Sequence, residues 1–102
     1  QNKRRPLIVV SNDEYNRYNN LVMTVPITSN HEYPLHINVG LIPTEDGGEV
    51  YGWAEIEQAK SLDLDARNAS KIASLEEETM ERITVMLLSG LMRPSMRIER
   101  IY

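Results

Sequence analysis

Four short apolar runs, flanked by residues typical of turns, fill the first half of the chain and limit what it can fold into. The runs are Leu7–Val10, Asn20–Ile27, Leu35–Val39 and Glu49–Ile56. They are rich in β-branched residues and short for helices, and the third alternates apolar with polar residues. This pattern predicts a small β-barrel or a strongly bent sheet, with its strands between about residues 6 and 73.

One helical pattern follows these runs. Ser74 and Glu77 have the spacing of a capping box at a helix start. The expected apolar positions of the helix are Met80, Ile83, Leu87 and Leu91. We therefore expect an amphipathic helix over about residues 75–90, ending near Gly90, and then a basic tail over residues 93–102.

The composition bounds the kind of protein. With 102 residues, the chain suits one domain with a modest core, and no apolar run approaches the roughly 20 residues of a membrane span. Cysteine is absent, which excludes disulfides and thiolate metal sites and suits a reducing cytoplasm. The net charge of −4 argues against non-specific coating of nucleic acid. We see no signal peptide, and the first residue is Gln1, so we expect an N-terminus that was processed, cut or left out.

Two polar groups stand at the ends of neighbouring runs. Arg5 precedes the first run and Thr28 follows the second. If the two strands lie side by side, a permanent cation and a hydroxyl share one site, which suits the binding and cleavage of a phosphodiester. Arg4 and Ser29 are candidate contacts beside them. The structural alternative is a solvated surface arginine, or a strand-end hydroxyl that bonds to backbone.

Three motifs, in order, resemble those of one protein family. They are RPLIVVSND at residues 5–13, VPITS at residues 25–29 and EQAKSLD at residues 57–63. Each is weak alone, but their order and spacing resemble the MazF/PemK toxins of bacterial type II toxin–antitoxin systems, over nearly the whole chain to about Leu91. The resemblance implies an SH3-like barrel with a C-terminal helix, a homodimer, and an endoribonuclease that cuts single-stranded RNA and so inhibits translation and growth. It also implies a PemI/MazE-like antitoxin whose acidic tail blocks the RNA groove.

The resemblance assigns roles to individual residues. It puts the family's catalytic arginine on Arg5 and its catalytic threonine on Thr28. Glu57 and Gln58 match an acid–glutamine pair that can read a base edge, with a polar strand end as the alternative. Trp53 lies within an apolar run and is expected in the core, although an aromatic ring can also stack on a base.

The expected chemistry uses the nucleophile that RNA carries, the 2′-hydroxyl next to the scissile phosphate. The chain has two histidines, His31 and His36, expected in a loop and on a sheet face, and no acidic cluster with convincing metal spacing. We therefore predict a path to a 2′,3′-cyclic phosphate that needs no metal or cofactor. Arg5 suits charge stabilisation and Thr28 suits orientation, while the group that takes the proton is left open.

Two departures from the family pattern stand out. The family's first strand and the flexible loop after it are not found ahead of Arg5, so we expect an incomplete barrel. Glu55 stands where some members carry an arginine, which puts base preference or proton transfer in question.

Two rival interpretations use the same fold. One is a gyrase-binding toxin without nuclease activity, like CcdB, and the other is an inactive interaction module. The pairing of Arg5 with Thr28 separates them from a nuclease, because a gyrase binder has no need of that pair.

Overall fold

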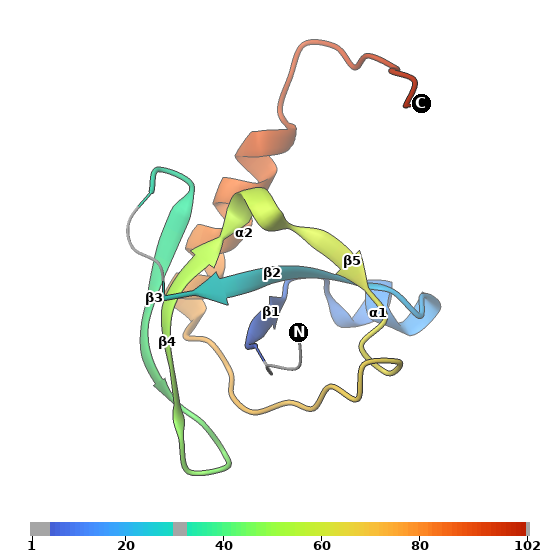
Figure 1. The fold of residues 1–102 in the computed structure, drawn as a ribbon. Helices are drawn as coiled ribbons and strands as arrows, with labels where there is room; N and C mark the ends of the chain where they lie inside the picture. Colours follow the sequence, from blue (N-terminus) through green and yellow to red (C-terminus); the bar gives the residue numbers. More distant parts are fainter. Residues whose placement is uncertain (1–4, 30–32, 102) are drawn as a thin grey trace.

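The computed structural model describes residues 5–29 and 33–101 of the chain, and it is mainly antiparallel β-structure with a C-terminal helix (Figure 1). The elements in chain order are β1 (Leu7–Val9), α1 (Asp13–Tyr18), β2 (Val22–Thr28), β3 (His36–Pro43), β4 (Glu49–Glu55), the short 3-10 helix η1 (Ile56–Gln58), β5 (Lys60–Leu62) and α2 (Glu77–Leu91). The predicted fold class is confirmed. At the start of the short helix α1, the side chain of Asn12 caps the helix by accepting from the amide of Tyr15.

The strands form one bent antiparallel sheet with β2 at its centre. The order is β1-β2-β4-β3, and β5 also pairs with β2. β4 and β5 both pair with the same edge of β2, and η1 lies between them in the chain. The pairing register shifts by three residues between β4 and β5, which is the length of η1. Within residues 5–29 and 33–101 no pairing joins β1 to β3, so the described part of the barrel is open.

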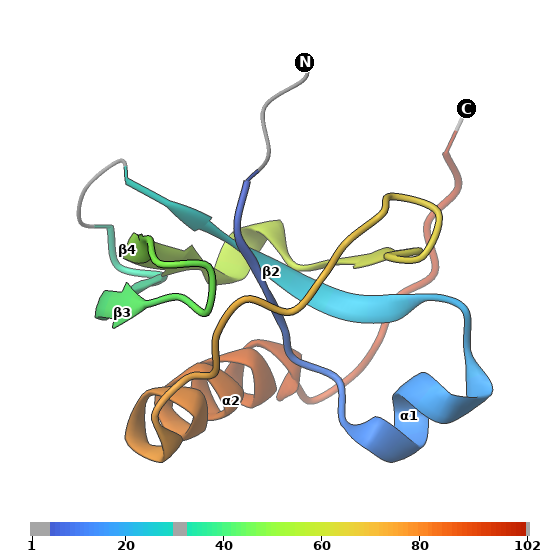
Figure 2. The ribbon, with the colours of Figure 1, turned by 90° about the horizontal axis from the view of Figure 1, so that it is seen from below.

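The core lies between the sheet and α2. Its buried apolar residues are Val25, Ile27, Ile37, Val39, Val50, Ala54, Ile56 and Ile83. Along β3 and β4 these residues alternate with more exposed ones, because successive side chains of a strand point to opposite faces, whereas on β2 Thr24 is buried next to Val25. α2 covers one face of the sheet, as Figure 2 shows. The other face is called the outer face below.

Gly52 allows β2 and β4 to approach closely. Its φ of +143° lies in a region that residues with a side chain rarely adopt, and an added Cβ would lie 2.2 Å from the carbonyl oxygen of Thr28. Any other residue here would push the two strands apart. The position of Thr28 beside β4 therefore depends on this glycine.

The helix starts later than the sequence predicts, and the capping box at Ser74 is wrong. α2 begins at Glu77, and its N-cap Glu76 makes no side-chain capping bond. The reason is tertiary: Ile72 and Leu75 pack against the core, and the amide of Glu45 donates to the carbonyl of Ile72 (2.7 Å). The chain stays extended through Leu75 to make these contacts.

The buried stripe of α2 also differs from the predicted one. Thr79 and Ile83 are buried, with Met86 and Leu87 partly so, whereas Met80 is 52% exposed and Leu91 62%. Of the four predicted apolar positions, only Ile83 and Leu87 contact the core. Beyond α2, residues 93–101 form no helix or strand and lead away from the sheet (Figure 1). In the described part of the chain no helix is both long and apolar enough to cross a membrane.

Candidate functional site

The pairing of β1 with β2 ends at Leu7 and Pro26, and the same register continued two residues further sets Arg5 opposite Thr28. The amide of Ile27 donates to the carbonyl of Pro6 (3.3 Å), which continues the β1–β2 register toward the chain start. The next residues on the two segments are Arg5 and Thr28. Residues opposite each other in an antiparallel pair share a face, with Cβ atoms about 5 Å apart. On this register the exposed arginine and the half-buried threonine would share the outer face.

Trp53 and Asn38 extend this row across the sheet. Trp53 pairs with Thr28 on one side and with Asn38 on the other. The expectation that Trp53 belongs to the core is wrong: it is half-buried and alternates with buried residues of β4. Its ring packs edge-on against that of Tyr51, with centroids 5.9 Å apart. The row Arg5–Thr28–Trp53–Asn38, called the outer row below, joins a cation, a hydroxyl, an indole and an amide.

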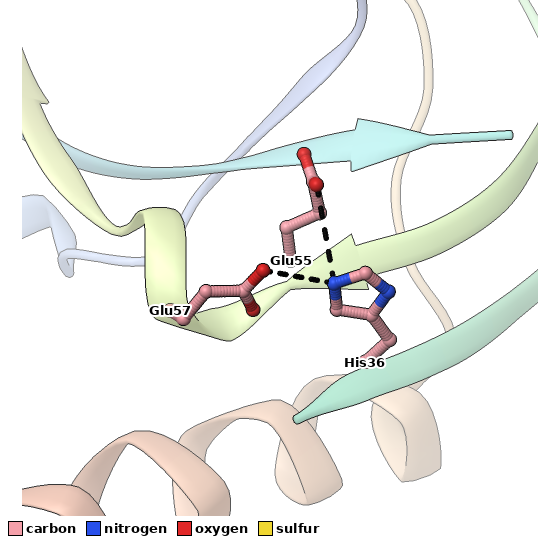
Figure 3. A group of neighbouring side chains, drawn as sticks. All are labelled: His36, Glu55 and Glu57. Atoms are coloured by element: carbon pink, nitrogen blue, oxygen red, sulfur yellow. Dashed lines mark hydrogen bonds and ion pairs between the residues drawn. The ribbon is translucent and has the colours of Figure 1, made fainter. Parts of the chain in front are cut away.

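A second group of side chains lies beside the outer row, at the end of β4. His36 pairs with Glu55 across β3 and β4. The Nε2 atom of His36 is 3.0 Å from Oε2 of Glu57 and 3.9 Å from Oε2 of Glu55, as Figure 3 shows. Glu55 is two residues from Trp53 along β4, so it lies on the same face, about 7 Å away. His36, Glu55 and Glu57, called the histidine cluster below, thus adjoin the Thr28 site.

The ring of His36 is held in place. Its side chain is only 8% exposed, and the ring of Tyr33 lies 5.0 Å away, centroid to centroid. The pKa of Glu57 reflects this contact. Partial desolvation of the carboxylate acts to raise its pKa, but the hydrogen bond with His36, a backbone hydrogen bond and the attraction of the imidazole outweigh that effect and lower it. Glu57 is therefore held as an anion whose direction is set by the histidine.

The histidine cluster was missed by reasoning from the sequence. His36 and Glu57 are 21 positions apart, and only the β3–β4 register brings them together. Its three ligand-type atoms lie within 4.8 Å of one another, so one imidazole nitrogen and two carboxylate oxygens could hold a divalent cation. The 3.0 Å contact has the length of a hydrogen bond, which already gives the group a role in orienting Glu57.

Only some of the other residues predicted to contact RNA lie within the described part of the chain. Glu57 and Gln58 lie in η1 and are exposed, and Ser29 is exposed directly after Thr28. Arg4 and His31 lie outside the described residues. Two hollows in the surface lie elsewhere, one of about 540 Å³ between α2 and β3 and one along Ile98–Ile101, and neither is lined by Arg5 or Thr28.

Known proteins share this sequence pattern and fold. The family model described as PemK-like, MazF-like toxin of type II toxin-antitoxin system matches residues 1–89. A MazE–MazF complex from Deinococcus radiodurans superposes with a TM-score of 0.75 at 27% identity, over 86% of this chain and 82% of that one. MazF alone from the same organism gives a TM-score of 0.71 at 29% identity, over 89% and 79% of the two chains.

A third solved structure, an endoribonuclease from Mycobacterial species, shares the fold with a TM-score of 0.71. It is 22% identical to this chain, over 89% of this chain and 83% of that one. No curated protein matches the sequence.

Proposed function

Because this chain belongs to the family of PemK-like, MazF-like toxins of type II toxin–antitoxin systems, we propose that it is an endoribonuclease that cuts single-stranded RNA at short specific sequences and so inhibits translation and growth. The observation that supports the proposal is the β1–β2 register, which brings the segment that carries Arg5 alongside the end of β2 that carries Thr28. The proposed reaction needs no metal ion. The MazF proteins of similar fold support the assignment.

Arg5 is proposed to bind the scissile phosphate. The 2′-oxygen attacks phosphorus, the bond to the 5′-oxygen breaks, and the products are a 2′,3′-cyclic phosphate and a 5′-hydroxyl. The 2′-hydroxyl loses its proton, and the departing 5′-oxygen gains one. Negative charge grows on the non-bridging oxygens in between, and a guanidinium stabilises it through two parallel hydrogen bonds.

Thr28 is proposed to orient the same group. A hydroxyl both donates and accepts, so it can hold a phosphate oxygen or the 2′-hydroxyl in line for attack. Its backbone pairs with Trp53 of β4, and the residue before it, Ile27, donates to the carbonyl of Pro6. Arg4, which precedes Arg5, and Ser29, which follows Thr28, are proposed as further phosphate or ribose contacts.

Glu57 and Gln58 are proposed to read bases. Both are exposed on η1, which bulges from the sheet between β4 and β5. His36 orients the Glu57 carboxylate, which can then accept from an exocyclic amine, while the Gln58 amide can donate and accept. A fixed direction matters here because a hydrogen bond weakens steeply when it is misaligned.

The proposed partners follow from the family. We propose a homodimer in the cytoplasm and an antitoxin of the MazE kind, whose acidic tail occupies the RNA site. A MazE–MazF complex of similar fold supports the antitoxin partner. An anionic tail and an RNA phosphate would compete for the same arginine, so bound antitoxin should prevent cleavage.

The test uses the full chain and a single-stranded RNA of mixed sequence, incubated in EDTA, with the fragment ends sequenced. We expect discrete cuts with cyclic phosphate ends, and no cutting of DNA of the same sequence, which lacks the 2′-hydroxyl. Arg5→Ala should lower the cleavage rate about 10²- to 10³-fold. Thr28→Val, which removes only the hydroxyl function, should also lower it.

Matched controls are available on the same surface. Arg67→Ala removes an exposed arginine in the turn after β5, and Thr84→Val removes an exposed hydroxyl on α2. Both should cleave at the wild-type rate, and urea unfolding should show that all four variants fold. Intact RNA with the wild-type chain would contradict the proposal, as would full activity in Arg5→Ala.

A further inference from the structure

We infer that Trp53 is a stacking platform for one base of single-stranded RNA, next to the phosphodiester held by Arg5 and Thr28. The inference rests on the proposed function, because it names a substrate contact beside that site. The residues of β4 that point into the core are Val50, Gly52 and Ala54. Trp53 alternates with them, so its indole belongs to the outer face.

The position of Trp53 in the outer row suits a base attached to the bound nucleotide. Neighbouring strands lie about 4.8 Å apart, so Trp53 begins about 5 Å from Thr28 and about 10 Å from Arg5. A phosphate held between β1 and β2 therefore leaves its adjoining base above β4. A base stacked on an aromatic side chain gains about 1–3 kcal/mol, and any base can do so because each has a flat π-face.

The indole is already ordered before RNA arrives. Trp53 is half-buried, and Tyr51 packs its ring edge-on against it at an interplanar angle of 68°. The rotamer freedom of Trp53 is therefore lost on folding rather than on binding, which favours affinity. Tyr51 is itself 56% exposed and widens the aromatic surface.

Trp53 and η1 would contribute to RNA recognition in different ways. Stacking tolerates every base, whereas the Glu57 carboxylate and Gln58 amide can distinguish base edges. Loss of the indole should therefore weaken binding to RNAs of all sequences to a similar extent. Loss of the Gln58 amide should instead change which sequences are preferred.

The experiment uses the fact that Trp53 is the only tryptophan in the chain. The full chain is titrated with a mixed-sequence 2′-fluoro RNA, which has no attacking hydroxyl and stays intact. We expect the tryptophan fluorescence to be quenched at saturation and the indole to be protected from acrylamide. An abasic oligomer of the same length should bind through its phosphates without this quenching.

Variants give a second measurement. Trp53→Leu should weaken RNA binding about 5- to 100-fold, and Trp53→Phe should retain most of the affinity. Tyr18→Leu is the matched control, because it removes an aromatic ring that is 75% exposed on α1, outside the outer row. Its affinity should equal that of the wild type. If Trp53→Leu fails to fold, the wild-type titration still decides.

Three results would overturn the inference: unchanged fluorescence at saturating RNA, equal quenching by the abasic oligomer, or fluorescence that follows protein concentration instead of RNA. The last result would mean that a second copy covers the indole. A parallel cleavage assay with ordinary RNA separates this inference from the proposed function. Cleavage without quenching would contradict the stacking role of Trp53 and support the proposed nuclease. Quenching without cleavage would contradict the proposed nuclease and support base binding at Trp53.

Discussion

The inner and outer faces of the sheet are built from alternate residues of the same strands, yet they differ in almost every physical respect. On β2, Val25 is fully buried on the inner face, while Thr28 is half-buried on the outer face. On β4, Ala54 contacts the core and its neighbour Trp53 lies beside Thr28. The inner face stabilises the fold through apolar burial, and the outer face carries the proposed RNA contacts. A substitution on one face should therefore change stability or activity, but rarely both.

Gly52 is the exception, because it couples the two faces, and its replacement should have the largest effect. In Gly52→Ala the added methyl group would meet the Thr28 carbonyl oxygen at 2.2 Å, in a backbone conformation that alanine rarely adopts. Strain and displacement together should cost about 2–6 kcal/mol in the free energy of unfolding. RNA cleavage by the protein that still folds should also fall, since Thr28 must move. Urea unfolding and a cleavage assay measure the two effects.

Gly47→Ala is the control that separates backbone strain from the clash. Gly47 also has a positive φ, +89°, but an added Cβ there would have nothing within 4 Å. In this variant only backbone strain should lower the free energy of unfolding, by about 1–3 kcal/mol, and the rate of RNA cleavage should stay the same. Equal losses in the two variants would contradict a special role for the close approach of β2 and β4.

Ile83 should have the next largest effect, confined to stability. It is 2% exposed and is the residue of α2 buried in the core of the sheet. Ile83→Ala should lower the free energy of unfolding by about 2–5 kcal/mol, through lost apolar burial and a cavity. Val85→Ala, at a position 59% exposed on the same helix, should change it by less than about 0.5 kcal/mol. A large loss of cleavage rate in folded Ile83→Ala would break the separation of the two faces.

The two faces also differ in how well the sequence predicts them. The long inner-face strands follow from alternation, as at Ile37 and Val39, because burial imposes a period of two residues. Arg5 and Thr28 are found at adjoining strand ends because both belong to recognisable sequence motifs. Local patterns predict these features since the information lies within a few residues.

Other features depend on contacts between distant segments. α2 starts at Glu77 because Ile72 and Leu75 pack against the core, and the capping pattern in the sequence does not indicate this packing. The contact between His36 and Glu57 depends on the pairing register of β3 with β4. The outer position of Trp53 was missed because a tryptophan among apolar residues usually indicates a core. Strand register and tertiary burial determine these three features, and a single sequence contains little information about either.

Loss of one hydrogen bond between β2 and β5 should have a smaller effect on stability. Thr24 is 1% exposed, and its hydroxyl donates to the carbonyl of Lys60 (2.8 Å), which ties β5 to β2. Thr24→Val keeps the shape and loses the bond, so the free energy of unfolding should fall by about 1 kcal/mol. Amide exchange in β5 should speed up, whereas exchange in α2 should not. A uniform change in exchange would instead indicate a general loss of stability.

The smallest expected effect is a local titration on the outer face. His36→Ala should raise the pKa of Glu57, because the hydrogen bond from the imidazole lowers it while desolvation acts in the opposite direction. The sign for stability follows: a lowered pKa in the folded state stabilises the fold above the ordinary pKa of glutamate, and this contribution is lost as the pH falls through the lowered value. Carboxyl NMR titration measures the shift. Asp46, whose pKa is lowered by hydrogen bonds with Thr44 and Gly48, is the internal control and should not move. An unchanged Glu57 titration would mean that His36 does not hold this carboxylate in solution.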